Sequence, residues 1–125
     1  MKFTNNVIKE CNIRIGNLDW KVKLVDDKNK YLYDINANPK ESNTSDAAMG
    51  MCYKNLCQIF ISNNMTSGNM KRTITHELTH AILYTYGLLA SKNDLDEEEI
   101  CNFMEIHLEE IRKLRNYCCK ELSVE

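Results

Sequence analysis

The hydrophobic pattern of the chain changes its period near residue 65, and this change limits the folds that the chain can adopt. Before that point apolar and polar residues alternate. In "DWKVKLV", Trp20, Val22 and Leu24 fall on one face and the two lysines between them fall on the other. A strand with one buried face has this period of two, whereas an amphipathic helix repeats every 3.6 residues. The pattern predicts a sheet at the N-terminal end of the chain.

Four further segments complete this first half. "VIKECNIRIG" also alternates, and Gly16-Asn17 is a turn that would join it to "DWKVKLV" as a hairpin. A polar turn and a short aromatic strand are predicted in "DDKNKYLYDI". "MCYKNLCQIFIS" is predicted to form two strands folded about Lys54-Asn55. Between these last two lies "NANPKESNTSDAAMG", whose Asn, Ser and Asp content predicts a loop.

Two long helices are predicted after the strands. In "SGNMKRTITHELTHAILYTYG" apolar residues recur at steps of three and four, with Thr66 or Ser67 as the cap and Gly87 as the stop. The second helix should begin near Asp94, because the acids of "DLDEEE" favour the positive end of a helix dipole. Its predicted buried stripe is Ile100, Phe103, Met104, Leu108, Ile111 and Leu114.

Length and composition limit the remaining choices. The chain has 125 residues and is 43% hydrophobic, which predicts one α+β domain over residues 1–125, with a small N-terminal antiparallel sheet packed on two long helices. Its 16 basic and 18 acidic residues give a net charge of -2, so no global positive field favours nucleic acid or an anionic membrane. The chain shows no signal peptide and no membrane-spanning run, and we expect a cytoplasmic protein.

The six cysteines show no paired C-x-x-C spacing. Without a secretory signal, reduced thiols are expected. The alternative is a metal role for Cys52 and Cys57, which would face one another if "CYKNLC" formed a hairpin.

The chemistry of the chain is concentrated in "THELTHAIL", where two of its three histidines lie four residues apart. Residues with this spacing share one helix face, so His76 and His80 would present both imidazoles to one point. Neutral imidazoles bind zinc, and Glu77 would reach a water on the metal without binding the ion itself. Zinc lowers the pKa of such a water to about 7, so that Glu77 could take its proton. The H-E-x-x-H spacing therefore predicts a zinc hydrolase site, and the alternative is a pair of ordinary helix histidines.

A stable site needs a third ligand from elsewhere in the chain. The second predicted helix begins with Glu97, Glu98 and Glu99, and it could return antiparallel to the first. Helical periodicity places Glu97 and Glu98 roughly inward and disfavours Glu99. The residues alone do not choose among these acids, most of which would simply complement the helix dipole.

"THELTHAIL" followed by "EEEICNF" resembles the ImmA/IrrE-type family of small zinc metallopeptidases, common in prophages and mobile elements. In that family an acid four residues before an Asn is the third zinc ligand, which implies Glu98, four residues before Asn102. The similarity covers roughly residues 48 to 110 and implies a zincin-like, gluzincin-type minimal domain. Family members often act on a DNA-binding repressor made by a neighbouring gene, which implies a protein partner here and no direct contact with nucleic acid.

The leading hypothesis is a zinc metalloendopeptidase. His76, His80 and Glu98 would bind Zn²⁺, and Glu77 would serve as general base and then as proton donor to the leaving amine. The alternative is a non-catalytic binding protein, stapled by zinc, that grips a repressor or a host defence protein. Zinc tying two helices together would stabilise so small a domain.

Three further residues have weaker roles in this hypothesis. Tyr84 and His107 are candidate donors to the developing oxyanion. For both, packing or a hydrogen bond to another side chain is the simpler role. Asn102 is expected to orient a ligand rather than to take part in catalysis.

Overall fold

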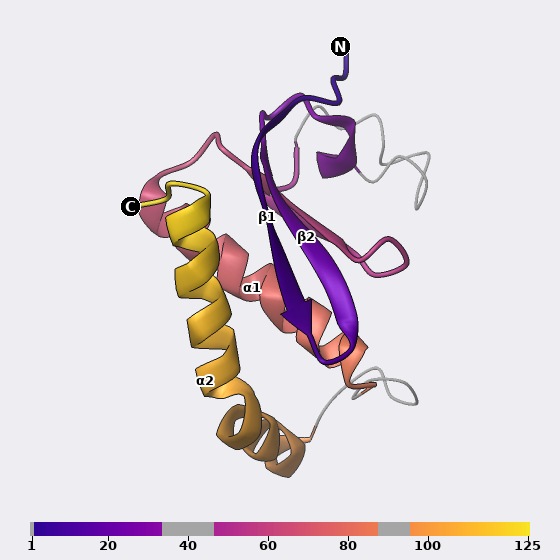
Figure 1. Ribbon diagram of the computed structural model, residues 1–125, viewed down its shortest axis with the longest axis vertical. Helices are drawn as coiled ribbons and strands as arrows, with labels where there is room; N and C mark the ends of the chain where they lie inside the picture. Colours follow the sequence, from indigo (N-terminus) through magenta and orange to yellow (C-terminus); the bar gives the residue numbers. More distant parts are fainter. Residues whose placement is uncertain (1, 34–46, 88–95) are drawn as a thin grey trace.

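The computed structural model of the protein describes residues 2–33, 47–87 and 96–125 (Figure 1). It confirms the α+β class, because a four-stranded sheet is followed by two long helices. Figure 1 shows α1 crossing behind the hairpin of β1 and β2, and α2 running beside that hairpin. The elements are β1 (Val7–Ile15), β2 (Leu18–Val25), the 3-10 helix η1 (Lys30–Leu32), β3 (Gly50–Tyr53), β4 (Gln58–Ser62), α1 (Ser67–Thr85) and α2 (Glu97–Glu121).

The strands lie in the order β1-β2-β4-β3, with β3 at an edge. Two pairs are antiparallel hairpins, but the central pair of β2 and β4 is parallel. The prediction of an antiparallel sheet was therefore wrong for its central pair. A parallel pair needs a crossover connection rather than a tight turn. Here the chain between β2 and β4 carries η1 and β3, so the pairing joins segments that are distant in sequence.

Both predicted hairpins are confirmed. Ile15 pairs with Leu18 across a turn in which Gly16 has a φ of 56°, a left-handed value that favours glycine. Tyr53 pairs with Gln58 across the second turn. The aromatic strand predicted in "DDKNKYLYDI" was wrong over Lys30–Leu32, which forms η1; the end of that segment and most of the predicted loop after it lie outside the described residues.

The core lies between the sheet and the two helices. Residues of β1, β2 and β4 that share one face join the buried residues of α1 and α2 in one cluster, so both helices cover that face. On β4, Ile59 and Ile61 belong to this cluster while Phe60 packs on the other face with Val25 and Leu32. A strand with apolar residues on both faces is typical of a central position. The alternation predicted for Trp20, Val22 and Leu24 is confirmed, since all three are buried.

The ends of α1 follow the predicted signals. The Thr66 side chain caps the helix by accepting a hydrogen bond from the backbone N–H of Asn69 at 3.2 Å. Gly87, just after its end, has a φ of 67°. The helix α2 is capped in the same way by Asp96, which accepts from the backbone N–H of Glu99 at 2.8 Å. Asp94, where its start was predicted, lies outside the described residues.

Only three of the six residues of the predicted buried stripe of α2 pack on the core. Phe103 and Ile111 are buried and Leu114 is half-buried against the core. The other three residues of the stripe are exposed, at 48% for Ile100, 41% for Met104 and 47% for Leu108. In Figure 1 the first turns of α2 extend beyond the end of the β1–β2 hairpin, so the sheet does not cover them.

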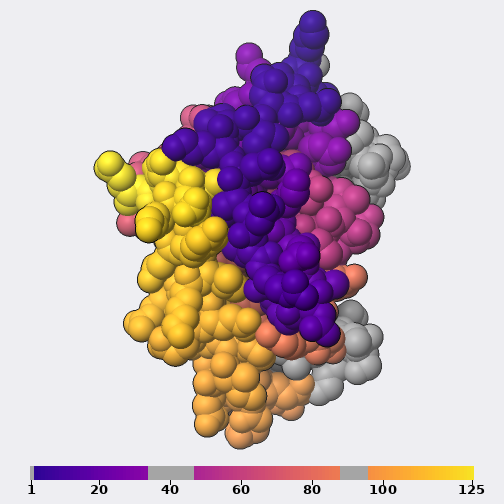
Figure 2. Space-filling view, viewed as in Figure 1, coloured from indigo at the N-terminus to yellow at the C-terminus, as the bar shows by residue number. Residues whose placement is uncertain are grey.

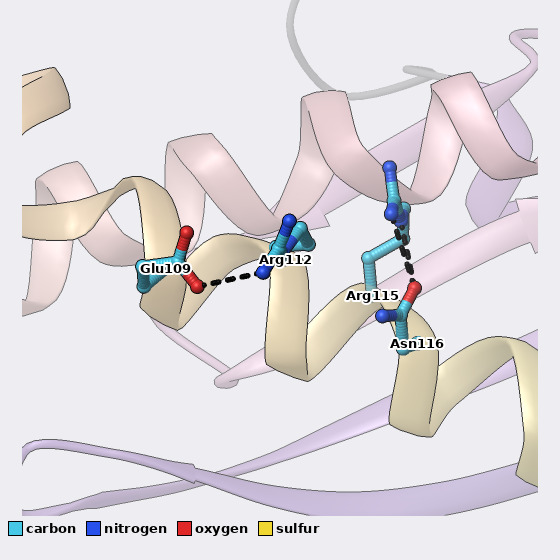
Figure 3. A network of polar contacts seen from close by, with 4 residues as sticks. All are labelled: Glu109, Arg112, Arg115 and Asn116. Carbon is cyan, nitrogen blue, oxygen red and sulfur yellow. Dashed lines mark hydrogen bonds and ion pairs between the residues drawn. The ribbon is translucent and has the colours of Figure 1, made fainter.

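The exposed surface of α2 carries apolar side chains, such as Ile106 at 70% exposed, as well as charged and polar ones. Arg112 pairs with Glu109 at 3.0 Å, and the Arg115 guanidinium donates to the Asn116 side chain at 3.0 Å (Figure 3). In the space-filling view, α2 forms one flank of the molecule beside the β1–β2 hairpin (Figure 2). None of the helices in the described ranges is long and apolar enough to cross a membrane.

Candidate metal centre

The helix α1 brings His76 and His80 together as predicted. Their Nε2 atoms lie 3.2 Å apart and their ring centroids 4.8 Å apart. Two nitrogens bound to one tetrahedral zinc ion at 2.0–2.1 Å would be about 3.3–3.4 Å apart. The pair therefore has the separation of two ligands of a single ion. The same distance fits a hydrogen bond in which one ring nitrogen donates to the other.

The protonation of His80 favours metal binding. Its pKa is lowered by burial, then by the neighbouring His76 and by Lys54, which lies in the turn between β3 and β4. A lowered pKa keeps the imidazole neutral at neutral pH, and a neutral imidazole is the form that binds a metal.

Glu77 is the most unusual side chain of α1. It is only 6% exposed, and within the described part of the chain it has no hydrogen bond or ion pair through its carboxylate. Burial raises its pKa, and the neighbouring His76 partly offsets that rise. Burial makes the ionised form of a carboxyl group costly, and groups with shifted pKa values cluster at functional sites.

The edge strand β3 packs directly over Glu77. A Cβ atom at Gly50 would lie 3.0 Å from Cγ of Glu77 and 2.6 Å from Cγ2 of Thr73, so only glycine allows this approach. Two residues further along β3, the Cys52 thiol has its pKa raised to about 12, first by burial and then by the charge of Glu77. Both observations place β3 against the carboxylate.

The cysteines of this hairpin are not paired directly across its two strands. Cys52 pairs with Ile59 across the two strands, while Cys57 lies in the turn with a φ of 53°. Within the described ranges the two thiols belong to no group of three His, Cys, Asp or Glu side chains that could hold a metal ion. All six cysteines fall within the described residues and are free thiols.

A cavity of about 480 Å³ opens beside His76 and Glu77. It lies between the start of β3 and the N-terminal half of α1, so the paired histidines and the buried carboxylate are close to a space that a ligand can enter. Its walls are Met49, Gly50, Asn69, Arg72, Thr73, His76 and Glu77.

The structure does not bring Glu98 to the two histidines. No group of three His, Cys, Asp or Glu side chains able to hold a metal ion is present in the described ranges. The expectation that Glu97 and Glu98 point inward was also wrong, because both are exposed and Glu99 is half-buried. No side chain of α2 before Phe103 is buried, so few packing contacts hold its first turns in place. Glu98 stays a prediction as the third ligand.

The other predicted residues have identifiable contacts. His107 lies between the rings of Tyr86 and Phe103, and its Nδ1 is 3.2 Å from Oε1 of Glu110. Tyr84 meets Trp20 edge to face at 6.3 Å between ring centroids. These contacts are the packing and hydrogen-bonding roles that we considered simpler than a role in catalysis. Asn102 is exposed.

Sequence reasoning missed four residues around the site. Arg72 had a usable signal, since it precedes His76 by one helical turn and shares its face. Gly50, Cys52 and Lys54 had none, because only the tertiary packing of the β3–β4 hairpin on α1 brings them close.

Comparisons with known proteins identified no relative of the chain. No model of a known protein family matches the chain, and neither a curated protein nor a solved structure matches it. The conclusion on function therefore depends on the residues and geometry of the site itself.

Proposed function

We propose that the protein is a cytoplasmic zinc-dependent metallopeptidase that hydrolyses a peptide bond in a protein substrate. The observation that carries this proposal is the position of Glu77. It is a buried carboxyl group with a raised pKa, it has no partner in the described part of the chain, and it lines a cavity beside two histidines with the spacing of metal ligands. General-base catalysis needs a carboxylate of this kind.

The roles of the residues follow from their chemistry. His76, His80 and Glu98 would hold the ion, and zinc, when bound, supplies a Lewis acid that acidifies water and polarises a carbonyl group. Glu77 takes the proton of the attacking water and later donates it to the leaving amine. Its raised pKa makes Glu77 a stronger base for the first transfer, and it brings the protonated form closer to neutral pH, which is the form that donates in the second transfer.

The edge strand supports a peptide as the substrate. No described strand pairs with the outer edge of β3, and an extended peptide can add to such an edge through backbone hydrogen bonds. Because Gly50 lies against Glu77, a peptide bound along β3 would run close to the catalytic carboxylate. A binding site for a small molecule would not need this arrangement.

The proposal requires Glu98 to approach the histidines when the metal binds. The first turns of α2 are suited to such a movement, since they carry no buried side chain before Phe103. The energy of metal binding would then be used in part to order this end of the helix.

The proposed substrate is a DNA-binding repressor, a partner that only the family resemblance suggests. The test is to incubate a candidate repressor, and unfolded casein as a general substrate, with the zinc-supplemented wild type and with Glu77→Gln. We expect cleavage by the wild type alone, because the amide keeps the shape of the side chain but cannot take the proton. If Glu77→Gln retained full biological activity, the zinc-stapled binding protein would be the better explanation.

A further inference from the structure

The cavity beside the catalytic carboxylate carries one permanent positive charge. Arg72 is the only lysine or arginine among the described residues that line it. Arg72 is exposed and makes no ion pair or hydrogen bond through its side chain with any residue that the structure describes. Its charge is therefore available to a ligand.

Glu77 does not neutralise Arg72, although both line the same cavity. No ion pair joins the Arg72 guanidinium to the Glu77 carboxylate among the residues that the structure describes. The rise along an α-helix is 1.5 Å per residue, so the two residues are separated by about 7.5 Å along the axis of α1. The cavity thus has a cationic end and a catalytic end.

The other side chains of the cavity wall do not compete for this charge. The Thr73 hydroxyl donates to the backbone carbonyl of Asn69 at 2.8 Å, and its methyl group faces Gly50. The Asn69 side chain has no described hydrogen bond and adds an amide donor near Arg72. A guanidinium with an amide close by is suited to a carboxylate, which accepts two parallel hydrogen bonds from arginine.

We propose that Arg72 makes this cavity a pocket for an acidic side chain of the substrate. The inference rests on the proposed function, because it names the class of peptide that the site takes. An extended peptide advances by about 3.4 Å per residue. The separation between Arg72 and Glu77 therefore places the acidic residue about two positions from the cleaved bond.

The test is a binding measurement that does not need cleavage. The ¹⁵N-labelled full chain, with Glu77→Gln to prevent turnover, is titrated by NMR with a capped alanine pentapeptide containing one central Glu, and with its Gln isostere. Samples are run with and without zinc. We expect the Glu peptide to shift the amide resonances of residues 69–77 and to bind at least about fivefold more tightly than the Gln peptide.

Arg72→Gln should abolish this preference, and Arg72→Glu should reverse it in favour of the matching Lys peptide. Lys71→Gln is the matched control, because Lys71 is the adjacent basic residue and its charge acts on Cys119 rather than on the cavity. Equal affinity for the Glu and Gln peptides, or a preference that survives in Arg72→Gln, would overturn the inference. A preference for the Glu peptide without cleavage of any substrate by the wild type would support the pocket and contradict the peptidase.

Discussion

Gly50 and Glu77 are in such close contact that a Cβ atom at residue 50 would lie 3.0 Å from Cγ of the glutamate. This contact joins the edge strand β3 to the helix α1. A peptide aligned along β3 would therefore lie close to the Glu77 carboxylate, which would act on it.

Replacing Gly50 by alanine tests this contact. The new Cβ would also be 2.6 Å from Cγ2 of Thr73 and 3.3 Å from the backbone oxygen of Phe60, so β3 or α1 must shift. We expect Gly50→Ala to lower the free energy of unfolding by about 1–3 kcal/mol in urea denaturation. Gly68→Ala is the control, since nothing lies within 4 Å of its added Cβ, and it should be neutral or stabilising by up to about 1 kcal/mol. Equal stability of Gly50→Ala and wild type would show that the two elements are not this close.

Alkylation of Cys52 reports on the burial of the same region. With a pKa of about 12, roughly one thiol in ten thousand is ionised at pH 8, so iodoacetamide should label the exposed Cys101 long before Cys52. Glu77→Gln removes a negative charge that raises this pKa, so Cys52 should then react faster. Mass spectrometry of labelled peptides measures both rates, with the urea-unfolded chain as reference. Labelling of Cys52 at the rate of Cys101 in the folded wild type would refute its burial beside Glu77.

The same pKa has a consequence for stability at alkaline pH. In the folded state the pKa of the Cys52 thiol is about 12, above its ordinary value of 9.0, so the protonated thiol stabilises the folded state. This stabilisation is complete below pH 9 and is lost as the pH rises toward 12. The stability of the wild type relative to Cys52→Val should therefore fall over that range. A difference that stays constant with pH would contradict the raised pKa.

Two isoleucines of α2 test which face of the helix packs on the core. Ile106 is 70% exposed and Ile111 is 5% exposed. Ile111→Ala should lower the free energy of unfolding by about 2–5 kcal/mol, whereas Ile106→Ala should change it by no more than about 0.5 kcal/mol. Thermal or urea unfolding of both variants measures the contrast. Similar losses would mean that the face of α2 that carries Ile106 is packed as well.

Local sequence signals were sufficient for most of the secondary structure. The alternation around Trp20 and the turn at Gly16 predicted the first hairpin, and Thr66 and Gly87 marked the ends of α1. The parallel pairing of β2 with β4 could not be predicted, because strand order depends on contacts between distant segments. For the same reason the apolar period of α2 did not show where the sheet would stop covering it.

The candidate site also has one part that local sequence signals predicted and another that depends on contacts between distant segments. His76, Glu77 and His80 belong to one helix, so their spacing alone fixed their arrangement. The close approach of Gly50 and the burial that raises the Glu77 pKa arise only when β3 packs on α1. Glu98 lies on a different element, and its position relative to the histidines depends on how α2 begins, which helical periodicity does not determine.

The zinc content of the chain purified without a chelator is the most direct test of the metal centre. We expect about one zinc ion per chain in the wild type and in Glu77→Gln, and none in His76→Ala. Glu98→Gln should weaken zinc binding by more than about a hundredfold. The removal of a metal ligand lowers the zinc affinity more than the removal of a residue that only hydrogen-bonds to a ligand. The neighbouring Glu97→Gln should leave binding unchanged. A metal-free wild type would contradict the proposed zinc centre, and unchanged zinc affinity in Glu98→Gln would contradict Glu98 as its third ligand.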